Sequence, residues 1–321
     1  MGTILFRRNT GVFQGKNRSQ RSETVCFGLI GSALFCYSDE NNDMSLVPMS
    51  RILEYAEKNN CAAGAFSVGN MEMVMGAVRA AEELYTPIIL QIAEKRLDYS
   101  PIELMAPMMV AAAKNASVDI AVHLDHGLTL ECIDKALELG FTSVMLDASL
   151  LSFEDNIEMT KKVVEKAKKY SATVESELGV IGGNEGDNAE HKILCTDPDM
   201  AEEFASRTGI DCLAVAIGNA HGNYPSLPEL RFDILEKIHK TVSVPLVLHG
   251  GTGMTADMFR KAIDLGIRKI NIATASFDAL AKGAKQCSDL CGNKSDYFAL
   301  SSAEAYAVYE NVKRHIEIFN N

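Results

Sequence analysis

The sequence predicts one α/β domain of the (β/α)8 class, a TIM barrel with a C-terminal helical extension, on two observations. Apolar strand-like runs alternate with amphipathic helix patterns about eight times from Met49 onward, which is the repeat of this barrel. The chain has 321 residues, the length of one such barrel, and its 47% hydrophobic content can supply the core. The alternative is a doubly wound open sheet, which is less favoured because no GxGxxG motif follows the first strand.

The eight expected strands are short apolar runs near residues 62–68, 87–93, 119–125, 143–148, 172–178, 211–217, 245–249 and 268–273. The helix patterns between them carry start and stop signals. Thr129 opens a helix that closes at Gly140, and Thr255 opens one that closes at Gly266. Further N-terminal signals are Asn70, Ser152 and Asp197-Pro198. Residues 297–319 are expected to form an amphipathic terminal helix that packs on the barrel or on another subunit.

The first 43 residues differ from the rest of the chain. Their basic residues precede the first acidic residue, Glu23, and an apolar run follows from Cys26 to Tyr37. One interpretation is a targeting segment, although no clear small-residue cleavage site is present. The other, which we favour, is a disordered tail or an overlong start. The expected organisation is therefore an N-terminal extension over 1–43 and a barrel over 44–321.

The composition limits the partners and the compartment. A formal net charge of −12 argues against nucleic acid and anionic membrane surfaces. No apolar run reaches the roughly 18–20 residues that span a bilayer. Eight cysteines are scattered without a CxxC pair, which indicates reduced thiols. We expect a cytoplasmic protein, with organelle targeting by residues 1–43 left open, and a phosphorylated ligand stays compatible because local groups can override the net charge.

Three of the seven histidines come directly after apolar strands. His126 follows the third strand, His221 the sixth and His249 the seventh. The C-terminal ends of barrel strands form one rim, so one divalent ion could bind all three side chains. Three histidines that leave a coordination position open are a catalytic zinc arrangement. Taken singly, each would be an ordinary hydrogen-bonded loop histidine, and His123, inside the third strand, is expected to be structural.

Two further features are expected at the same rim. Gly250-Gly251-Thr252-Gly253 follows the seventh strand and Asn271-Ile272-Ala273-Thr274 ends the eighth, where barrels commonly bind phosphate. Glu175 and Glu177 occupy alternate positions of the fifth strand and therefore face the same side, toward the barrel mouth. A glycine-rich loop follows, on which Glu185 could enter and leave a site. Alone, these features would be an ordinary turn and a solvated acidic loop.

Together these motifs resemble the class II, metal-dependent ketose-bisphosphate aldolase family, nearest to its fructose-bisphosphate and tagatose-bisphosphate enzymes. The resemblance covers roughly Met49 to Lys285 with the motifs in the right order. It rests on His-Leu-Asp-His-Gly at 123–127, the run from Glu175 to Glu185, Gly-Asn-Ala-His-Gly at 218–222, His-Gly-Gly-Thr-Gly at 249–253 and Asn-Ile-Ala-Thr at 271–274.

The resemblance implies a role for each residue. Zinc would bind to His126, His221 and His249, while Asp125 would be the proton donor and acceptor at the aldehyde oxygen. Glu185 would exchange the C1 proton of dihydroxyacetone phosphate. The implied substrate-binding residues are Gly222, Gly250, Gly251, Thr252, Asn271, Ile272, Ala273 and Thr274. Asp147 and Glu177 match the positions of a second divalent metal in some members, and a monovalent cation is a further candidate.

The implied reaction is the reversible cleavage of a ketose 1,6-bisphosphate to dihydroxyacetone phosphate and glyceraldehyde 3-phosphate through a zinc-stabilised ene-diolate. The implied assembly is a homodimer or homotetramer. A metal is also expected on chemical grounds, because no strand end offers an obvious buried lysine for a Schiff base. Two rival classes are a zinc hydrolase, since three histidines and an acid also activate water, and a non-catalytic phosphosugar-binding protein.

Some positions depart from the family pattern, and they concern the aldehyde half of the substrate. Ser67 and Ala93 stand where many members have asparagine and serine, and Thr252 replaces a commoner serine. Glu94-Lys95-Arg96 is more charged than the usual loop after the second strand, and Ser276-Phe277 stands where many members carry a basic residue. The sequence therefore leaves open whether the sugar is fructose, tagatose or another phosphorylated ketose.

Overall fold

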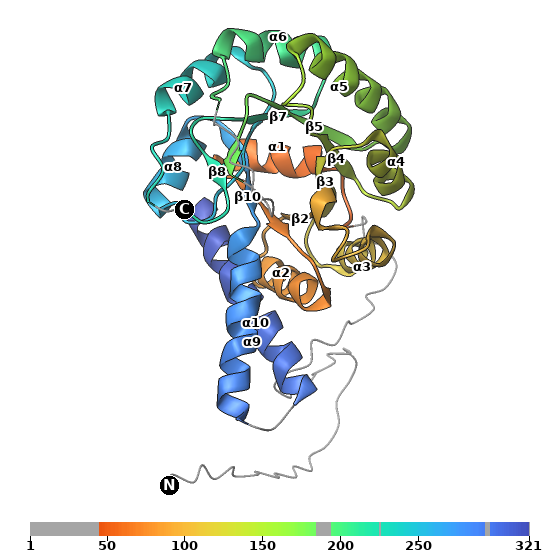
Figure 1. The fold of residues 1–321 in the computed structure, drawn as a ribbon, viewed down its shortest axis with the longest axis vertical. Coiled ribbons are helices and arrows are strands. Elements are labelled where there is room, and N and C mark those ends of the chain that lie inside the picture. The colour runs from red at the N-terminus through yellow and green to blue at the C-terminus, as the bar shows by residue number, and fades with distance from the viewer. Residues whose placement is uncertain (1–44, 184–193, 225, 293–295, 321) are drawn as a thin grey trace, which may run out of the picture. The chain divides into compact units, whose positions relative to one another are not determined.

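The computed structural model describes residues 45–183, 194–224, 226–292 and 296–320. Eight parallel strands close into a barrel in the order β1-β10-β9-β7-β5-β4-β3-β2 (Figure 1). Their bounds are β1 (Ala63–Ser67), β2 (Ile88–Ala93), β3 (Ile120–Gly127), β4 (Ser143–Leu146), β5 (Thr173–Leu178), β7 (Cys212–Val215), β9 (Leu246–Leu248) and β10 (Ile267–Ile272). The predicted barrel is confirmed. The open sheet is excluded because β1 pairs with both β10 and β2.

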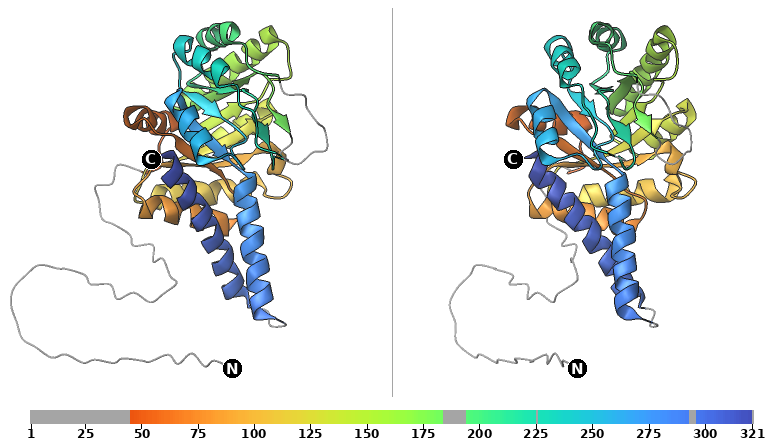
Figure 2. Two further views of the ribbon diagram at one scale, coloured as in Figure 1. Left: turned by 90° about the vertical axis from the view of Figure 1, so that its left-hand side faces the viewer. Right: turned by 60° about the vertical axis from the view of Figure 1, so that its left-hand side comes forward.

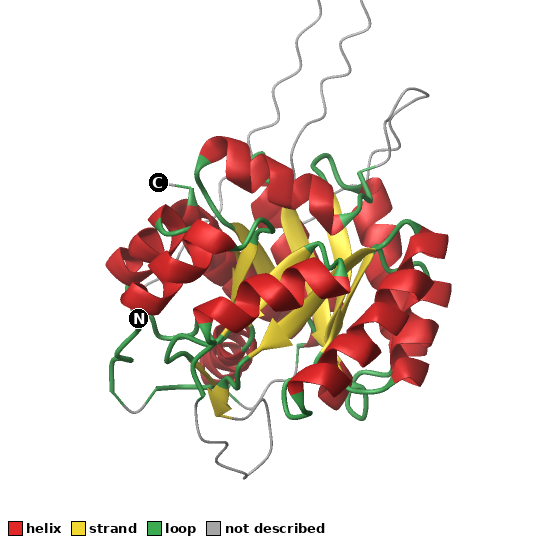
Figure 3. Ribbon diagram, turned by 90° about the horizontal axis from the view of Figure 1, so that it is seen from above, coloured by secondary structure: helices red, strands yellow, loops and turns green. Residues whose placement is uncertain are grey.

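Helices surround the barrel (Figure 3). They are α2 (Met71–Glu83), α3 (Ile102–Asn115), α4 (Leu130–Glu138), α5 (Phe153–Ala167), α6 (Pro198–Thr208), α7 (Phe232–Thr241), α8 (Ala256–Asp264) and α9 (Thr274–Cys291). The predicted N-caps are observed. The side chains that accept a hydrogen bond from the first turn of a helix are those of Asn70, Thr129, Ser152, Asp197 and Thr255.

Helix α1 (Met49–Asn59) closes the N-terminal end of the barrel (Figure 1). The chain reaches it through Ser45, whose carbonyl accepts a hydrogen bond from the amide of Ile120 at the start of β3. Met49 and Ile52 of α1 pack against inward-facing apolar side chains such as Ile89. The remaining core lies between the strands and the outer helices. The predicted extension over residues 1–43 lies outside the described residues.

The predicted terminal helix is confirmed as α10 (Tyr297–Phe319), which packs on the barrel domain and beside α9 (Figure 2). Glycines permit close approach at both helix contacts. A Cβ on Gly76 of α2 would lie 2.5 Å from the carbonyl oxygen of Ala305, and one on Gly283 of α9 would lie 2.8 Å from that of Ala303. Within the described part of the chain, no helix is long and apolar enough to cross a membrane.

One element was not expected. β6 (Gly182–Gly183) and β8 (Ala220–His221) form a separate two-stranded parallel sheet. Each follows a barrel strand, β5 or β7, on the C-terminal side. The pairing of Gly183 with His221 fixes the backbone of a predicted metal ligand against the segment that follows Glu177.

Candidate active site

The end of β3 directs two consecutive polar side chains into the barrel mouth. Neighbours on a regular strand point to opposite faces. His126 has a left-handed φ of 40°, and the register of β3 against β4 shifts between Leu124 and Gly127. Such a bulge re-aims a side chain, and here it turns the His126 imidazole inward together with Asp125. A strained backbone at a polar position is typical of a functional site.

The structure brings the three predicted zinc ligands together. The ring centroids of His126 and His249 are 4.6 Å apart, and those of His126 and His221 are 4.8 Å apart. One ring nitrogen from each histidine lies within 4.8 Å of those of the other two. The side chains come from the C-terminal end of β3 and from the segments after β7 and β9, as expected for one rim.

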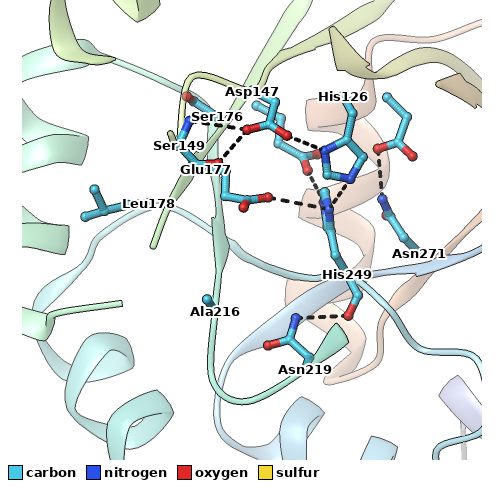
Figure 4. Close-up of polar contacts among 12 residues, drawn as sticks. His126, Asp147, Ser149, Ser176, Glu177, Leu178, Ala216, Asn219, His249 and Asn271 are labelled. Atoms are coloured by element: carbon cyan, nitrogen blue, oxygen red, sulfur yellow. Dashed lines mark hydrogen bonds and ion pairs between the residues drawn. The ribbon is translucent and has the colours of Figure 1, made fainter. Parts of the chain in front are cut away.

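Carboxylates fix the orientation of two of these rings. His126 Nδ1 lies 2.8 Å from Asp147 Oδ2 (Figure 4). His249 Nε2 lies 2.8 Å from Glu175 Oε1. The other two nitrogens, His126 Nε2 and His249 Nδ1, face each other at 2.9 Å. A ring that donates to a carboxylate presents a lone pair at its other nitrogen, and two facing lone pairs need a cation or a proton between them. The donor set therefore fits a zinc ion.

The three histidines differ in the direction in which their surroundings shift the pKa. Burial lowers the pKa of His221 to about 3 and that of His249 to about 4. Burial also lowers the pKa of His126, but the charges of Asp125 and Asp147 raise it well above the ordinary value. His221 and His249 are thus neutral ligands at neutral pH, while His126 carries the proton that a metal would displace.

A second group of donors shares His126. Ligand atoms of His126, Asp147 and Glu177 also lie within 4.8 Å of one another. Glu177 Oε2 is buried and has no hydrogen-bond partner among the described residues. Burial, with the nearby charge of Asp147, raises the pKa of Glu177 well above that of an ordinary carboxyl. This set fits a divalent cation, which would supply the missing partner.

A polar network that the sequence did not predict lies beneath these residues. The buried Lys269 Nζ is 2.8 Å from Glu175 Oε2 and 2.8 Å from Asn271 Oδ1. The prediction that no strand end offers a buried lysine is not affected, because Lys269 lies in the middle of β10. The Lys269 amine is held by short contacts with Glu175 and Asn271 and is not free to attack a carbonyl, so this lysine does not favour a Schiff base. The signal was its position two residues before Asn271, which puts both side chains on one strand face. His123 is buried and bonded to Ser143, in agreement with a structural role.

Two amides hold the Asp125 carboxylate. Its Oδ1 accepts a hydrogen bond from Asn271 Nδ2 and its Oδ2 accepts one from Gln91 Nε2, both at 3.0 Å. The Asn271 amide, grouped with the phosphate loop in the sequence, is thus directed at Asp125. Sequence reasoning missed Gln91, although a polar residue inside the apolar β2 was a signal. The two bonds fix a carboxylate at the barrel mouth without neutralising it.

The predicted phosphate-binding segments meet at the start of α9. The amide of Gly251 donates to the carbonyl of Asn271, and the Thr252 hydroxyl accepts a hydrogen bond from the amide of Ala275 at 3.1 Å. Gly250 has a left-handed φ of 66°, and a Cβ there would overlap the carbonyl of Ala220. A helix N-terminus favours an anion, and these loops lie at the N-terminus of α9. Of the other predicted residues, Gly222 has a φ of 87°, the side chain of Ile272 lies in the core, and Ala273 and Thr274 begin α9.

A cavity of about 220 Å³ opens onto two of the three histidines, His126 and His221. His126, Asp147, Glu177 and His221 line it together with Lys95, while apolar side chains from the β4–α5 connection cover the other side. The predicted base Glu185 lies outside the described residues.

Comparison with known proteins agrees with this geometry. The family model "Fructose-bisphosphate aldolase class-II" matches residues 47–321. The chain is 40% identical over 248 residues to the fructose-bisphosphate aldolase of Geobacillus stearothermophilus, covering 76% of this chain and 86% of that one. It is also 40% identical over 282 residues to the sulfofructosephosphate aldolase of Alkalicoccus urumqiensis, covering 87% and 98%.

A solved structure gives the same result. The YdjI aldolase of Escherichia coli K12 superposes with a TM-score of 0.76 at 36% identity, over 85% of this chain and 97% of that one. The fold and the site thus define an aldolase. The chain belongs to the class II fructose-bisphosphate aldolase family.

Proposed function

We propose that this protein is a zinc-dependent aldolase that reversibly cleaves a ketose 1,6-bisphosphate to dihydroxyacetone phosphate and glyceraldehyde 3-phosphate. The observation that carries the proposal is the opposed pair His126 Nε2 and His249 Nδ1 beside the fixed carboxylate of Asp125. A set of metal ligands and a proton carrier are the two parts that an aldol cleavage needs.

We assign the zinc ion to His126, His221 and His249, and a second divalent cation to Asp147 and Glu177 with His126. When bound, zinc supplies a Lewis acid that stabilises negative charge on the oxygens of the ene-diolate. The chain's own carboxylates complete the arrangement, because Asp147 orients one ligand ring and Glu175 orients another.

Asp125 is the proposed carrier of the proton at the aldehyde oxygen. Its hydrogen bonds from Gln91 and Asn271 hold it in one orientation, which general acid–base catalysis requires. Glu185 is the proposed base at C1 of dihydroxyacetone phosphate, an assignment that rests on the sequence motif. The two acids therefore serve opposite ends of the bond that is cleaved.

The dihydroxyacetone phosphate end is proposed to bind at the start of α9. Gly222, Gly250, Gly251 and Thr252 would contribute from one side, and the segment from Asn271 to Thr274 from the other. A monovalent cation near the phosphate is part of the same proposal. The support is the convergence of backbone amides and the Thr252 hydroxyl at a helix N-terminus.

The sugar itself has two candidates. Fructose and tagatose bisphosphates fit the proposed site equally, since they differ only in stereochemistry. A different phosphorylated ketose is the second candidate, favoured by the 40% identity to a sulfofructosephosphate aldolase and by the charged turn Glu94-Lys95-Arg96.

The proposal extends to assembly and compartment. We propose a homodimer or homotetramer, because Leu290 of α9 and Tyr297 and Phe298 of α10 expose large apolar side chains. A cytoplasmic location is proposed on the cysteines, since those in the described ranges are free thiols. Light scattering of the purified protein tests the assembly.

A substrate panel tests the reaction. The zinc-loaded full-length chain is given fructose and tagatose 1,6-bisphosphates, and both triose phosphate and inorganic phosphate are measured. An aldolase releases dihydroxyacetone phosphate and no inorganic phosphate. Release of inorganic phosphate alone would indicate the rival hydrolase, and binding without any product would indicate a non-catalytic sugar-binding protein.

A further inference from the structure

Two adjacent cations stand at the barrel mouth without a counter-ion among the residues that the structure describes. They are Lys95 and Arg96 in the short 3-10 turn η1 (Glu94–Arg96), which directly follows β2. Neither side chain forms a hydrogen bond or an ion pair with any residue that the structure describes, and Arg96 Nε is buried. Buried donors normally have an acceptor, and in a chain of net charge −12 a basic pair without a carboxylate partner indicates an anionic ligand.

The barrel register places this turn beside Asp125. Ala93, the last residue of β2, is the register partner of Asp125 on β3, and η1 begins at the next residue. Lys95 lines the same cavity as His126 and His221. The cations therefore lie on the side of the mouth where the aldehyde oxygen would meet Asp125.

An aromatic ring orients the arginine. The guanidinium carbon of Arg96 lies 5.1 Å from the ring centroid of Phe277 on α9. Phe277 is itself packed on the turn after β1, where a Cβ on Gly69 would lie 3.3 Å from its Cε1. Stacking fixes the plane of a guanidinium and leaves its N–H groups free to bind an oxyanion.

The acid next to the pair is engaged elsewhere. The Glu94 carboxylate accepts hydrogen bonds from the amides of Leu128 and Thr129, at 2.6 and 3.1 Å, where α4 begins. These bonds fasten η1 to the β3–α4 connection. The turn is thus held in place by its first residue, while the following two residues keep their charges available.

We infer that Lys95 and Arg96 bind a terminal oxyanion, a phosphate or a sulfonate, on the last carbon of the aldehyde half of the substrate. The inference rests on the proposed function, because it takes dihydroxyacetone phosphate to lie at the loops after β9 and β10. In the barrel order β1 separates β10 from β2, so the turn after β2 and the loops after β9 and β10 occupy different positions around the barrel mouth and can bind the two anionic ends of one ketose.

The test compares substrates with and without the terminal anion. Arg96→Met and Lys95→Met, each in the zinc-loaded full-length chain, are assayed with the preferred ketose 1,6-bisphosphate and with the corresponding 1-phosphate. Each variant should lower kcat/KM for the bisphosphate about ten- to a hundredfold, the value of one hydrogen bond to a charged group. The 1-phosphate should be unaffected. The matched control is Lys135→Met on α4, which removes a surface lysine 3.5 Å from Glu103. This variant should leave kcat/KM unchanged for both substrates.

The condensation direction identifies the oxyanion. Dihydroxyacetone phosphate is combined with glyceraldehyde 3-phosphate, with its sulfonate analogue 3-sulfolactaldehyde, and with neutral glyceraldehyde. The wild-type chain should prefer an anionic aldehyde, and both variants should lose that preference. The faster of the two anionic aldehydes shows whether phosphate or sulfonate is the natural group.

Hydrogen exchange at C1 of dihydroxyacetone phosphate distinguishes a failure of the proposed function from a failure of this inference. The exchange needs only the part of the site that binds dihydroxyacetone phosphate, and not the part that binds the terminal oxyanion. A wild-type chain with neither exchange nor cleavage refutes the proposed function, and the inference with it. Normal exchange with an unchanged bisphosphate-to-monophosphate ratio in both variants overturns the inference alone. Loss of exchange in Arg96→Met would place the dihydroxyacetone phosphate at this turn and would also overturn it.

Discussion

The lumen of the barrel holds two polar layers that bury charge in different ways. The lower layer consists of His123, Glu175 and Lys269, and the upper layer of His126, Asp147, Glu177, His221 and His249. Glu175 and Glu177 stand two positions apart on β5 and face the same side. Glu175 bonds to Lys269 Nζ and His249 Nε2, whereas Glu177 Oε2 has no hydrogen-bond partner among the described residues.

The pKa directions follow the same division. Burial raises the pKa of both carboxyls, but at Glu175 the charge of Lys269 and the hydrogen bond from His249 together more than offset it and hold the pKa well below the usual range. At Glu177 burial and the charge of Asp147 outweigh the opposing effects of His126 and a backbone hydrogen bond from Ile181, and the pKa is raised. A buried carboxylate that is paired with charged groups of the chain itself, as Glu175 is, has a structural role. A buried carboxylate oxygen that lacks a hydrogen-bond partner, as in Glu177, indicates a ligand site.

Removing the carboxylate that faces the substrate should have the largest effect. Asp125→Ala is expected to lower cleavage about 10²–10⁴-fold, because the proton at the aldehyde oxygen loses its carrier. Zinc content should stay unchanged, since the three histidines are intact. Cleavage rate and metal analysis on one preparation measure both. Asp134→Ala on the outer face of α4, where the acid pairs with Lys166, is the control. Turnover of Asp125→Ala close to wild type would remove this residue from the reaction.

Breaking the lower layer should cost stability. Lys269→Met leaves Glu175 as a buried charge without its partner and should lower the free energy of unfolding by about 3–5 kcal/mol. Urea unfolding of the metal-free protein measures the loss. Lys135→Met on the surface should stay within about 0.5 kcal/mol of wild type. A loss at Lys269 as small as that of the control would mean that the lower layer is not a support.

Removing a carboxylate from the upper layer should raise the free energy of unfolding, whereas the Lys269 substitution lowers it. Glu177→Gln removes a buried charge whose Oε2 has no hydrogen-bond partner among the described residues, and should stabilise the metal-free protein by about 1–3 kcal/mol. A raised pKa of Glu177 in the folded state lowers the stability only above the ordinary carboxyl pKa, so the gain should be present at neutral pH, grow as the pH rises and vanish as the pH falls below about 4. Unfolding midpoints across that range test it. Glu175→Gln is the matched comparison and should lower the free energy of unfolding. If both substitutions change the free energy of unfolding in the same direction, the distinction between the two layers is wrong.

Residues 1–43 should have the smallest effect. The first described residues already belong to the barrel, since Ser45 accepts from and Val47 donates to the backbone of Ile120. A chain beginning at Met44 is therefore expected to fold and turn over like the full chain. Unfolding midpoint and cleavage rate check this. A large drop in either would mean that the N-terminal segment supports the barrel.

The sequence predicts the fold and the three histidines for the same reason. Each strand has its own apolar run, and each histidine follows one, so a local pattern places it on the rim. The inward turn of His126 could not be predicted, because it depends on a shift in the pairing of β3 with β4. The partner of Asp125 could not be predicted either, because Asn271 is 146 residues away and only barrel closure brings the two together.

Lys269 is a further feature of the site that could not be predicted from the sequence. It stands within a strand that is buried along its whole length, where an isolated lysine is improbable. Only the structure shows Glu175 at 2.8 Å across the lumen. Strand position thus predicts which residues face inward, while the pairing of their charges depends on contacts between distant segments.

Metal dependence is the property on which the proposed function rests most directly. The measurement is the rate of ketose-bisphosphate cleavage by one preparation as isolated with zinc, after treatment with EDTA, and after zinc is added back, with metal content determined at each stage. We predict that cleavage disappears with the metal and returns with zinc, because the facing nitrogens of His126 and His249 are built to share a cation. Full cleavage by a preparation shown to contain no metal would contradict the assignment.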